Sequence, residues 1–487
     1  MSHAKSNALT RRDLLKLGGM TAGMATAPAI ISCSRHAKMP QNIILMVSDG
    51  MSASVPQLAD AFSLTVRGSD TNWKKLLLNP AVTQGSFDMG SLQSMVTDSG
   101  AAITSWSSGS RVNNRALNTL PDGTQLKPIG KIAKEQGHKV GLVTTTRLTH
   151  ATPAGFIASV PVRDYEDEIA EQFIGYTDIM LGGGAYFFDK DYRNDFRDLF
   201  DLYRKANYKV IFTREELHSE TTKNYPGPIL GTFDADHLPF TLDWKHDPEK
   251  QKRIPTLAEM TFQALHHLKD QPFLLQVEGG RVDHAAHAND FAGILWDQLA
   301  FDDALGEVLK FAHERDDTLV IVTTDHGNSN PGLNGFGYGY SESTHYFEKV
   351  KKVKATSSFI NEKAKEILYH QSSVTPQQII NIIKENTSFE LTEKEAEALI
   401  ESLPKVLPPK PLDWNEQHRN FGGLLGQMLG NHLGVQWTGI SHTSDWVQSL
   451  AMGPGSAALH GHRLNTDLFP ILTNFLGSSH RNPSFPS

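Results

Sequence analysis

Carboxylate and imidazole side chains follow several apolar segments of the chain, where they are placed to bind metal ions. They are Asp49, Glu278, Asp283, His287, Asp325, His326 and His442. A helix would put Asp283 and His287 on one face, as a shared ion requires. The adjacent Asp325 and His326 reach one ion only where the backbone turns, which we expect Gly327 to allow. Each pair alone is also typical of an ordinary polar contact, but together they predict mixed Asp/His sites suited to zinc.

The remaining oxygen donors predict a third ion. Asp49, Thr152 and Glu278 offer carboxylate and hydroxyl oxygens near the ends of apolar runs. Hard cations prefer such ligands. The sequence therefore predicts a magnesium site beside the zinc sites.

Ser99 is the candidate nucleophile. It follows Asp98 and precedes small and apolar residues, which predicts a helix that begins at Ser99. The first backbone N–H groups of a helix lack partners and carry positive partial charge, so this position suits an anion such as phosphate. The alternative is that Asp98 or Ser99 only caps the helix. The metal-ligand pattern favours the catalytic interpretation.

Short apolar runs that end in polar residues alternate with helical patterns. The runs are 42–47, 140–143, 179–181, 273–277 and 319–322, and the helical patterns include 129–136, 166–175 and 291–315. Apolar runs without alternation are typical of parallel strands covered on both faces. The predicted fold class is therefore α/β, a doubly wound, mostly parallel central sheet flanked by helices, with ligands at the carboxyl ends of the strands.

The alternation breaks after His326. A stretch rich in Gly, Asn and Tyr is followed by helices with capping-box signals at Thr375 and Thr392. We interpret 330–435 as an insertion, a lid over the pocket or a dimer contact. The catalytic domain then comprises 42–329 and 436–480, where a strand-like pattern near 439–450 and a helix around 466–476 complete the chain.

The N-terminal segment predicts export. Arg11 and Arg12 precede a weakly apolar stretch that is too short for a good transmembrane helix, which is typical of a twin-arginine signal. Cys33, the single cysteine, follows in a lipobox-like context. We expect residues 1–33 to be a signal peptide with a lipidation site at Cys33, and 34–41 to be a linker. The mature protein would be periplasmic, or a lipoprotein anchored in a membrane and facing the periplasm or the cell surface.

Composition narrows the function classes. A chain of 487 residues holds one large α/β domain with insertions or two to three ordinary domains. Its net charge of −8 shows no basic excess, so no nucleic-acid partner is expected. One cysteine excludes an internal disulfide framework.

Six motifs together resemble the alkaline phosphatase family. They are Ser48-Asp49-Gly50-Met51, Thr97-Asp98-Ser99-Gly100-Ala101-Ala102, the segments 144–153 and 278–287, Thr324-Asp325-His326-Gly327 and Ser441-His442-Thr443, in the family's order. The resemblance implies hydrolysis of small phosphate monoesters through a phosphoserine, with two Zn²⁺ and one Mg²⁺ per subunit, and a homodimer.

The resemblance also implies a role for each site residue. Asp283, His287 and His442 would bind the first zinc, Asp49, Asp325 and His326 the second, and Asp49, Thr152 and Glu278 the magnesium, with His150 as a further candidate. Ser99 would be the nucleophile, Arg163 would bind phosphate, Asp98 would position Arg163, and His284 would lie near the phosphate.

Two positions depart from the best-known bacterial pattern, and other functions remain open. That pattern has Asp where this chain has His150 and Lys where it has His284, which leaves room for another divalent ion in the third site. Relatives that cleave phosphodiesters or sulfate esters share the two-zinc core, so a phosphodiesterase or sulfatase is the alternative. A non-enzymatic lipoprotein that binds zinc or phosphate is a second alternative.

Overall fold

The computed structural model describes residues 39–403, 417 and 420–486. The twin-arginine segment, Cys33 and most of the 34–41 linker lie outside the described residues. Within them, ten strands form one sheet in the order β14-β2-β13-β8-β1-β7-β3-β4-β6-β5. The strands are β1 (Asn42–Val47), β2 (Thr83–Asp88), β3 (Lys139–Arg147), β4 (Ile179–Gly183), β5 (Lys209–Ile211), β6 (Ile229–Thr232), β7 (Phe273–Glu278), β8 (Thr318–Thr323), β13 (Val447–Met452) and β14 (Gly461–Leu464).

The sheet is mostly parallel, as the sequence predicts. β1 pairs in parallel with β7 and β8, whereas β13 runs antiparallel to both β8 and β2. Along β1, Ile43 and Leu45 belong to one apolar core and Ile44 and Met46 to the other. Both faces of the strand are therefore buried, which explains its unbroken apolar sequence.

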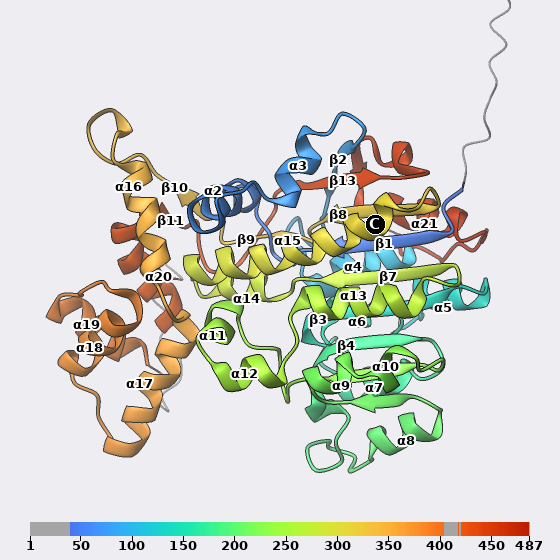
Figure 1. Cartoon of the computed structure of the whole chain (residues 1–487), viewed down its shortest axis with the longest axis horizontal. Helices are drawn as coiled ribbons and strands as arrows, with labels where there is room; N and C mark the ends of the chain where they lie inside the picture. Colours follow the sequence, from blue (N-terminus) through green and yellow to red (C-terminus); the bar gives the residue numbers. More distant parts are fainter. Residues whose placement is uncertain (1–38, 404–416, 418–419, 487) are drawn as a thin grey trace, which may run out of the picture. The chain divides into compact units, whose positions relative to one another are not determined.

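Helices cover both faces of the sheet (Figure 1). One core includes α4 (Ser99–Ser108), α5 (Ile129–Glu135), α7 (Glu166–Gln172), α8 (Leu199–Lys205) and α21 (Leu468–Phe475). The other includes α3 (Asn72–Leu78), α13 (Leu257–Leu268) and α15 (Phe291–His313). The short helices α6 (Ala151–Ala154) and α14 (Arg281–His287) follow β3 and β7. Among the described residues, no helix combines the length and apolar character needed to cross a membrane.

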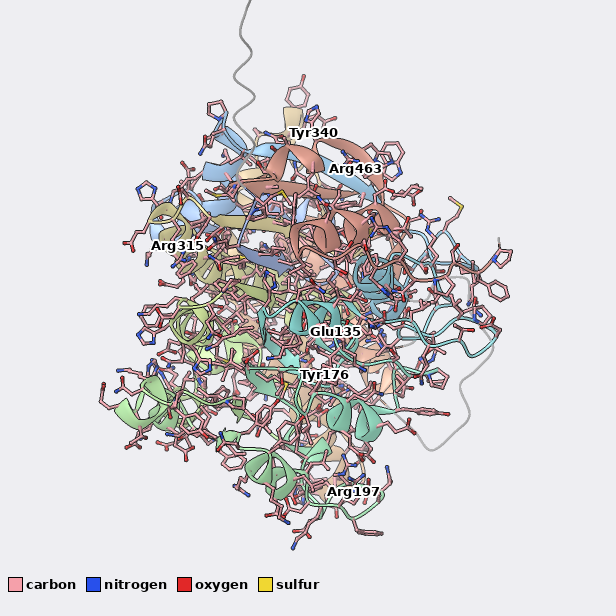
Figure 2. The ribbon with its side chains drawn as sticks, turned by 90° about the vertical axis from the view of Figure 1, so that its right-hand side faces the viewer. Glu135, Tyr176, Arg197, Arg315, Tyr340 and Arg463 are labelled. Atoms are coloured by element: carbon pink, nitrogen blue, oxygen red, sulfur yellow. The ribbon has the colours of Figure 1, made fainter. Side chains whose placement is uncertain are left out.

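The segment interpreted as an insertion is helical. It contains α16 (Ser343–Glu348), α17 (Ser357–Gln371), α18 (Pro376–Thr387), α19 (Glu393–Ser402) and α20 (Phe421–Leu433). Two short strands, β10 (Gly332–Leu333) and β11 (Val435–Gln436), pair where it leaves and rejoins the rest of the chain. Its apolar side chains share a core with α2 (Val55–Arg67) and α15. Tyr340, labelled in Figure 2, is 76% exposed at its start.

Two aspartates, the buried Asp290 and the half-buried Asp243, join α17 to the catalytic domain. Asp290 accepts hydrogen bonds from the backbone N–H groups of Gly293 and Ser357, at 2.8 and 2.6 Å. Asp243 accepts from the backbone and hydroxyl of Thr356 at 2.8 and 2.6 Å. Both carboxylates therefore satisfy donors at the start of α17.

Replacing Asp290 with Asn is expected to change how stability depends on pH. Burial raises the pKa of Asp290 to about 6, above the value of about 3.9 for an exposed aspartate. The folded protein therefore holds this proton to higher pH than the unfolded chain, and the contribution of Asp290 to the free energy of unfolding falls by about 3 kcal/mol as pH rises from about 4 to about 6. Asn stays neutral, so the melting temperature of Asp290→Asn minus that of wild type should rise over this interval.

The matched control is Asp303→Asn, because Asp303 lies on α15, the helix that Asp290 caps, but its side chain is 48% exposed and paired with Arg67. Metal loss at low pH affects both variants and the wild type alike. A melting-temperature difference for Asp290→Asn that stays constant from pH 4 to pH 7 would contradict the assignment.

Candidate active site

Ser99 begins α4, as the sequence predicts. The Asp98 side chain caps the helix by accepting a hydrogen bond from the backbone N–H of Ala101 at 2.9 Å. The Ser99 side chain is buried, and its Oγ lies 3.2 Å from Nε2 of His326. The cap and the hydroxyl thus have separate roles: Asp98 satisfies the helix end, which leaves the Ser99 hydroxyl facing the metal-ligand groups.

Arg163 is held beside the helix start from two sides. Its Nη1 donates to Asp98 Oδ2 at 2.9 Å, and its Nη2 lies 2.9 Å from His150 Nε2. Burial alone would raise the pKa of Asp98, but Arg163 and the N–H of Ala101 hold that pKa below its usual value. Asp98 is therefore a carboxylate that can orient the guanidinium.

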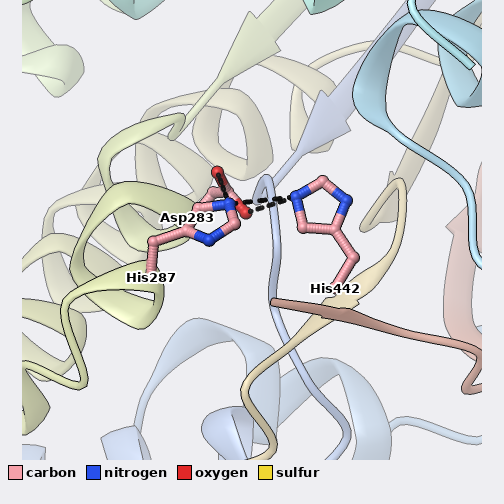
Figure 3. Close-up of side chains that lie close together, drawn as sticks. All are labelled: Asp283, His287 and His442. Carbon is pink, nitrogen blue, oxygen red and sulfur yellow. Dashed lines mark hydrogen bonds and ion pairs between the residues drawn. The ribbon is translucent and has the colours of Figure 1, made fainter. Parts of the chain in front are cut away.

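Asp283, His287 and His442 form the first metal-ligand group (Figure 3). His287 donates from Nδ1 to the carbonyl of Ile440 at 2.7 Å, and His442 donates from Nδ1 to the carbonyl of Thr97 at 2.8 Å. Both Nε2 atoms then face each other at 3.1 Å, and they lie 3.4 and 3.5 Å from the Asp283 carboxylate oxygens. Two facing lone pairs beside a carboxylate fit a cation.

The pKa of His287 supports this interpretation. Burial lowers it, but Asp283 more than offsets burial and raises the pKa of His287 to about 9. An imidazole nitrogen held beside a carboxylate attracts a proton, and a metal ion would compete with that proton for the same lone pair.

Asp49, Asp325 and His326 form the second group, which is fully buried. Nε2 of His326 lies 3.2 Å from Asp325 Oδ2 and 3.5 Å from Asp49 Oδ1. Both of these carboxylate oxygens lack a hydrogen-bond partner within the part of the chain that the structure describes. Burial, followed by neighbouring carboxylates, raises the pKa of Asp325 to about 6 and that of Asp49 well above its usual value. Buried, unpartnered carboxylate oxygens of this kind fit a metal ion.

Two glycines permit the close packing around this group. Gly50 has φ of +68°, and a Cβ there would lie 2.5 Å from Asp283 Oδ1. The expectation that Gly327 provides a turn is wrong. It lies in the short strand β9 (Gly327–Asn328), which pairs with β12 (His442–Thr443), and a Cβ would lie 2.5 Å from the Thr443 hydroxyl. Gly327 is therefore required for close approach of two strands.

Asp49, His150 and Glu278 form the third group. Glu278 Oε2 accepts hydrogen bonds from the hydroxyls of Thr144 and Thr146, whereas its Oε1 has no partner in residues 39–403, 417 and 420–486. Burial raises the pKa of Glu278 to about 7. The Thr152 hydroxyl lies 3.5 Å from Asp49 Oδ2. The structure thus brings the four candidate ligands of the third ion together, with His150 supplying a nitrogen.

A cluster of imidazoles adjoins the third group. The ring centroid of His284 lies 4.4 Å from that of His237 and 5.5 Å from that of His150. Nδ1 of His284 lies 2.6 Å from Arg281 Nη1, and Arg281 stacks on Phe240. Sequence reasoning missed His237 and Arg281. No sequence motif marks the loop that contains His237. Arg281 lies in the motif 278–287, but the sequence indicated no catalytic or binding role for it.

The unpartnered atoms of the second and third groups fit metal ions. Asp49 Oδ1, Asp325 Oδ2, Glu278 Oε1 and His150 Nδ1 are buried and have no hydrogen-bond partner among the residues that the structure describes. Leaving such groups unsatisfied costs folding free energy, and a bound cation satisfies them. Mixed nitrogen and oxygen donors suit zinc in the first two groups.

Comparisons with known proteins agree with this geometry. A family model described as alkaline phosphatase matches residues 40–478. Alkaline phosphatase 3 of Bacillus subtilis is 29% identical, with 88% of this chain and 87% of that protein covered. Alkaline phosphatase of Escherichia coli is similar over 66% of this chain and 78% of that protein, at 27% identity.

A solved structure shows the same fold. The crystal structure of Thermus thermophilus alkaline phosphatase superposes with a TM-score of 0.83 at 31% identity, covering 95% of this chain and 98% of that one. Together with these matches, the mostly parallel sheet flanked by helices and the candidate metal-ligand groups around Ser99 place the chain among the metal-dependent phosphatase hydrolases. The chain belongs to the alkaline phosphatase family.

Proposed function

We propose that this protein hydrolyses small phosphate monoesters to an alcohol and inorganic phosphate through a phosphoserine at Ser99. The observation that carries the proposal is the position of Ser99 Oγ. It lies at a helix start, 3.2 Å from the His326 nitrogen of the second group, and follows the carboxylate that binds Arg163. The candidate nucleophile, the Arg163 guanidinium that would bind phosphate and the candidate metal ligands therefore lie in one site.

Arg163, Asp98 and Ser99 each have a role in the proposed reaction. Arg163 binds two non-bridging oxygens of the phosphate, and Asp98 holds the guanidinium in the orientation this requires. Ser99 Oγ forms a bond to phosphorus while the bond to the alcohol oxygen breaks, and the alcohol leaves with the proton that the Ser99 hydroxyl gives up. Water then attacks phosphorus in line, the bond to Ser99 Oγ breaks, and inorganic phosphate leaves while a proton from the water returns to Ser99.

We assign two zinc ions to the first and second groups and a magnesium ion to the third. Bound there, zinc would supply Lewis acidity that lowers the pKa of the attacking hydroxyl and stabilises the leaving oxygen. For the third site, a mutant of the alkaline phosphatase from the Antarctic bacterium TAB5 is described with Mg bound in its M3 site. We place His284 near the phosphate.

The competing activities are phosphodiester and sulfate-ester hydrolysis. Arg163 and the third group favour a monoester, because they suit its additional charged oxygens. The test compares hydrolysis of p-nitrophenyl phosphate, bis-p-nitrophenyl phosphate and p-nitrophenyl sulfate by residues 34–487 with zinc and magnesium supplied. Monoester kcat/KM should exceed the other two by orders of magnitude, and a preference for the diester or the sulfate would refute the proposal.

Replacing Arg163 with Ala is expected to lower kcat/KM for p-nitrophenyl phosphate by about 100- to 10,000-fold. Two charged hydrogen bonds, each contributing about 1.5–3 kcal/mol, are lost. Arg163→Lys should recover part of this, because it restores charge without the planar fork. Arg115→Ala is the matched control, since Arg115 is an exposed arginine paired with the neighbouring Asp164. Equal losses for Arg163→Ala and Arg115→Ala would contradict the phosphate-binding role.

We further propose export by the twin-arginine route, lipidation at Cys33 and a homodimer. The sequence around Arg11, Arg12 and Cys33 supports the first two. Radiolabelled palmitate should be incorporated into wild type and absent from Cys33→Ser, and labelling of the variant would refute lipidation. Sedimentation of residues 34–487 tests the dimer, and a purely monomeric protein would refute it.

A further inference from the structure

His150 lies between Arg163 and the third metal-ligand group, and both need a lone pair of its imidazole ring. Its Nε2 lies 2.9 Å from Nη2 of Arg163. The same imidazole supplies the nitrogen of the third metal-ligand group, together with Asp49 and Glu278. Its Nδ1 is buried and has no hydrogen-bond partner among the described residues. The ring therefore stands between the phosphate-binding arginine and a candidate metal site.

A single lone pair cannot satisfy both neighbours. A guanidinium only donates hydrogen bonds, so Nε2 must accept from Arg163, which places the ring proton on Nδ1. Ligation through Nε2 would displace Arg163 from that atom. Ligation through Nδ1 would move the proton to Nε2, where it would face an N–H of Arg163. Whichever nitrogen binds the ion, the hydrogen bond to Arg163 is lost.

The surroundings favour an exchange of partners over a large movement of the ring. The imidazoles of His237 and His284 both pack edge-on against His150, with centroids 5.5 Å away. Arg163 keeps its Nη1 contact with Asp98 when the Nη2 contact is lost. The N–H of Nη2 that faced His150 is therefore released for a second phosphate oxygen, while Nη1 carries another N–H that can donate to the first.

We propose that His150 couples the third metal site to phosphate binding. An ion ligated by His150 frees the Nη2 arm of Arg163 for a phosphate oxygen, and a phosphate that takes this arm frees His150 for the ion. By thermodynamic linkage, each raises the affinity for the other by the same factor. This inference rests on the proposed function, in which Arg163 binds the substrate phosphate.

The test measures metal binding rather than turnover. Zinc-loaded Ser99→Ala protein is titrated with Mn²⁺, and free Mn²⁺ is followed by its electron paramagnetic resonance signal. Mn²⁺ accepts nitrogen and oxygen ligands and binds more weakly than the zinc in the first two groups. We expect 1 mM inorganic phosphate to raise Mn²⁺ affinity by at least about fivefold. The absence of any Mn²⁺ site would overturn the proposal.

A double-mutant cycle separates the lone-pair competition from simple charge effects. Arg163→Met removes a cation whether or not His150 is present, so its electrostatic effect on Mn²⁺ binding cancels between backgrounds. Without phosphate, Arg163→Met should raise Mn²⁺ affinity at least about threefold more in the His150 background than in His150→Phe. Equal effects in the two backgrounds would overturn the proposal.

His284→Phe provides the matched control. His284 belongs to the same imidazole cluster, but its Nδ1 pairs with Arg281 instead of Arg163. Its cycle with Arg163→Met should be additive, and non-additivity as large as that of His150 would assign the effect to packing and overturn the proposal. None of these binding measurements requires turnover. If the His150 cycle is additive while the protein with Ser99 intact hydrolyses p-nitrophenyl phosphate, the proposed coupling is refuted and the proposed function stands.

Discussion

Ser99→Ala is expected to lower kcat for p-nitrophenyl phosphate by at least about a thousandfold, because it removes the atom that bonds to phosphorus. The Ser99 side chain is buried and its hydroxyl faces His326. Alanine lacks the hydroxyl and fits the same space, so the fold should be retained. The measurement is the initial rate at saturating substrate with zinc and magnesium supplied.

Ser105→Ala is the matched control on the same helix. Its hydroxyl donates to the carbonyl of Ala101 within α4 and does not face the metal-ligand groups. We expect this variant to retain kcat within about threefold, because only a local hydrogen bond is lost. Comparable losses for Ser99→Ala and Ser105→Ala would point to damage of the helix and contradict a nucleophilic role.

Removal of metal is expected to abolish activity and to lower the melting temperature strongly. Without cations, Asp49, Glu278 and Asp325 remain as buried carboxyl groups whose pKa values burial raises. An ion present at about 1,000 times its dissociation constant stabilises the folded state by about 4 kcal/mol. Chelation followed by activity and melting measurements should show both losses, and zinc with magnesium should restore both.

Asp325→Ala tests the metal assignment at one candidate ligand. It should reduce the zinc content measured after dialysis, whereas Asp303→Asn, at a half-exposed surface aspartate, should leave it unchanged. Full activity after complete chelation, or unchanged zinc content in Asp325→Ala, would contradict the metal assignment.

The predicted apolar runs coincide with strands that are buried on both faces, whereas the buried four-residue strand β6 and the more polar β2 were missed. The apolar run 42–47 coincides with β1, since both of its faces lie in apolar cores. β2 was not predicted, because Thr83–Asp88 is polar and half-exposed near the edge of the sheet. Capping boxes at Thr375 and Thr392 were confirmed, because this signal is local.

The candidate site was predictable where residue type and spacing carry the chemistry. Asp283 and His287 share one face of α14, and Asp98 caps α4, as expected from four-residue spacing and helix-start signals. The position of His237 depends on the loop after β6, which no local pattern specifies. The dual contacts of His150 depend on elements far apart in the sequence, so only the structure shows them.

The most direct test of the central claim is mass spectrometry of the Ser99 peptide after rapid acid quenching of the metal-loaded enzyme with a phosphate monoester. Acid stops hydrolysis of the intermediate and preserves a phosphate ester of serine. We predict phosphate on Ser99 and on no other residue of α4, with none in Ser99→Ala. Steady turnover with an unmodified Ser99 at every quench time, or phosphate on another residue, would contradict the account.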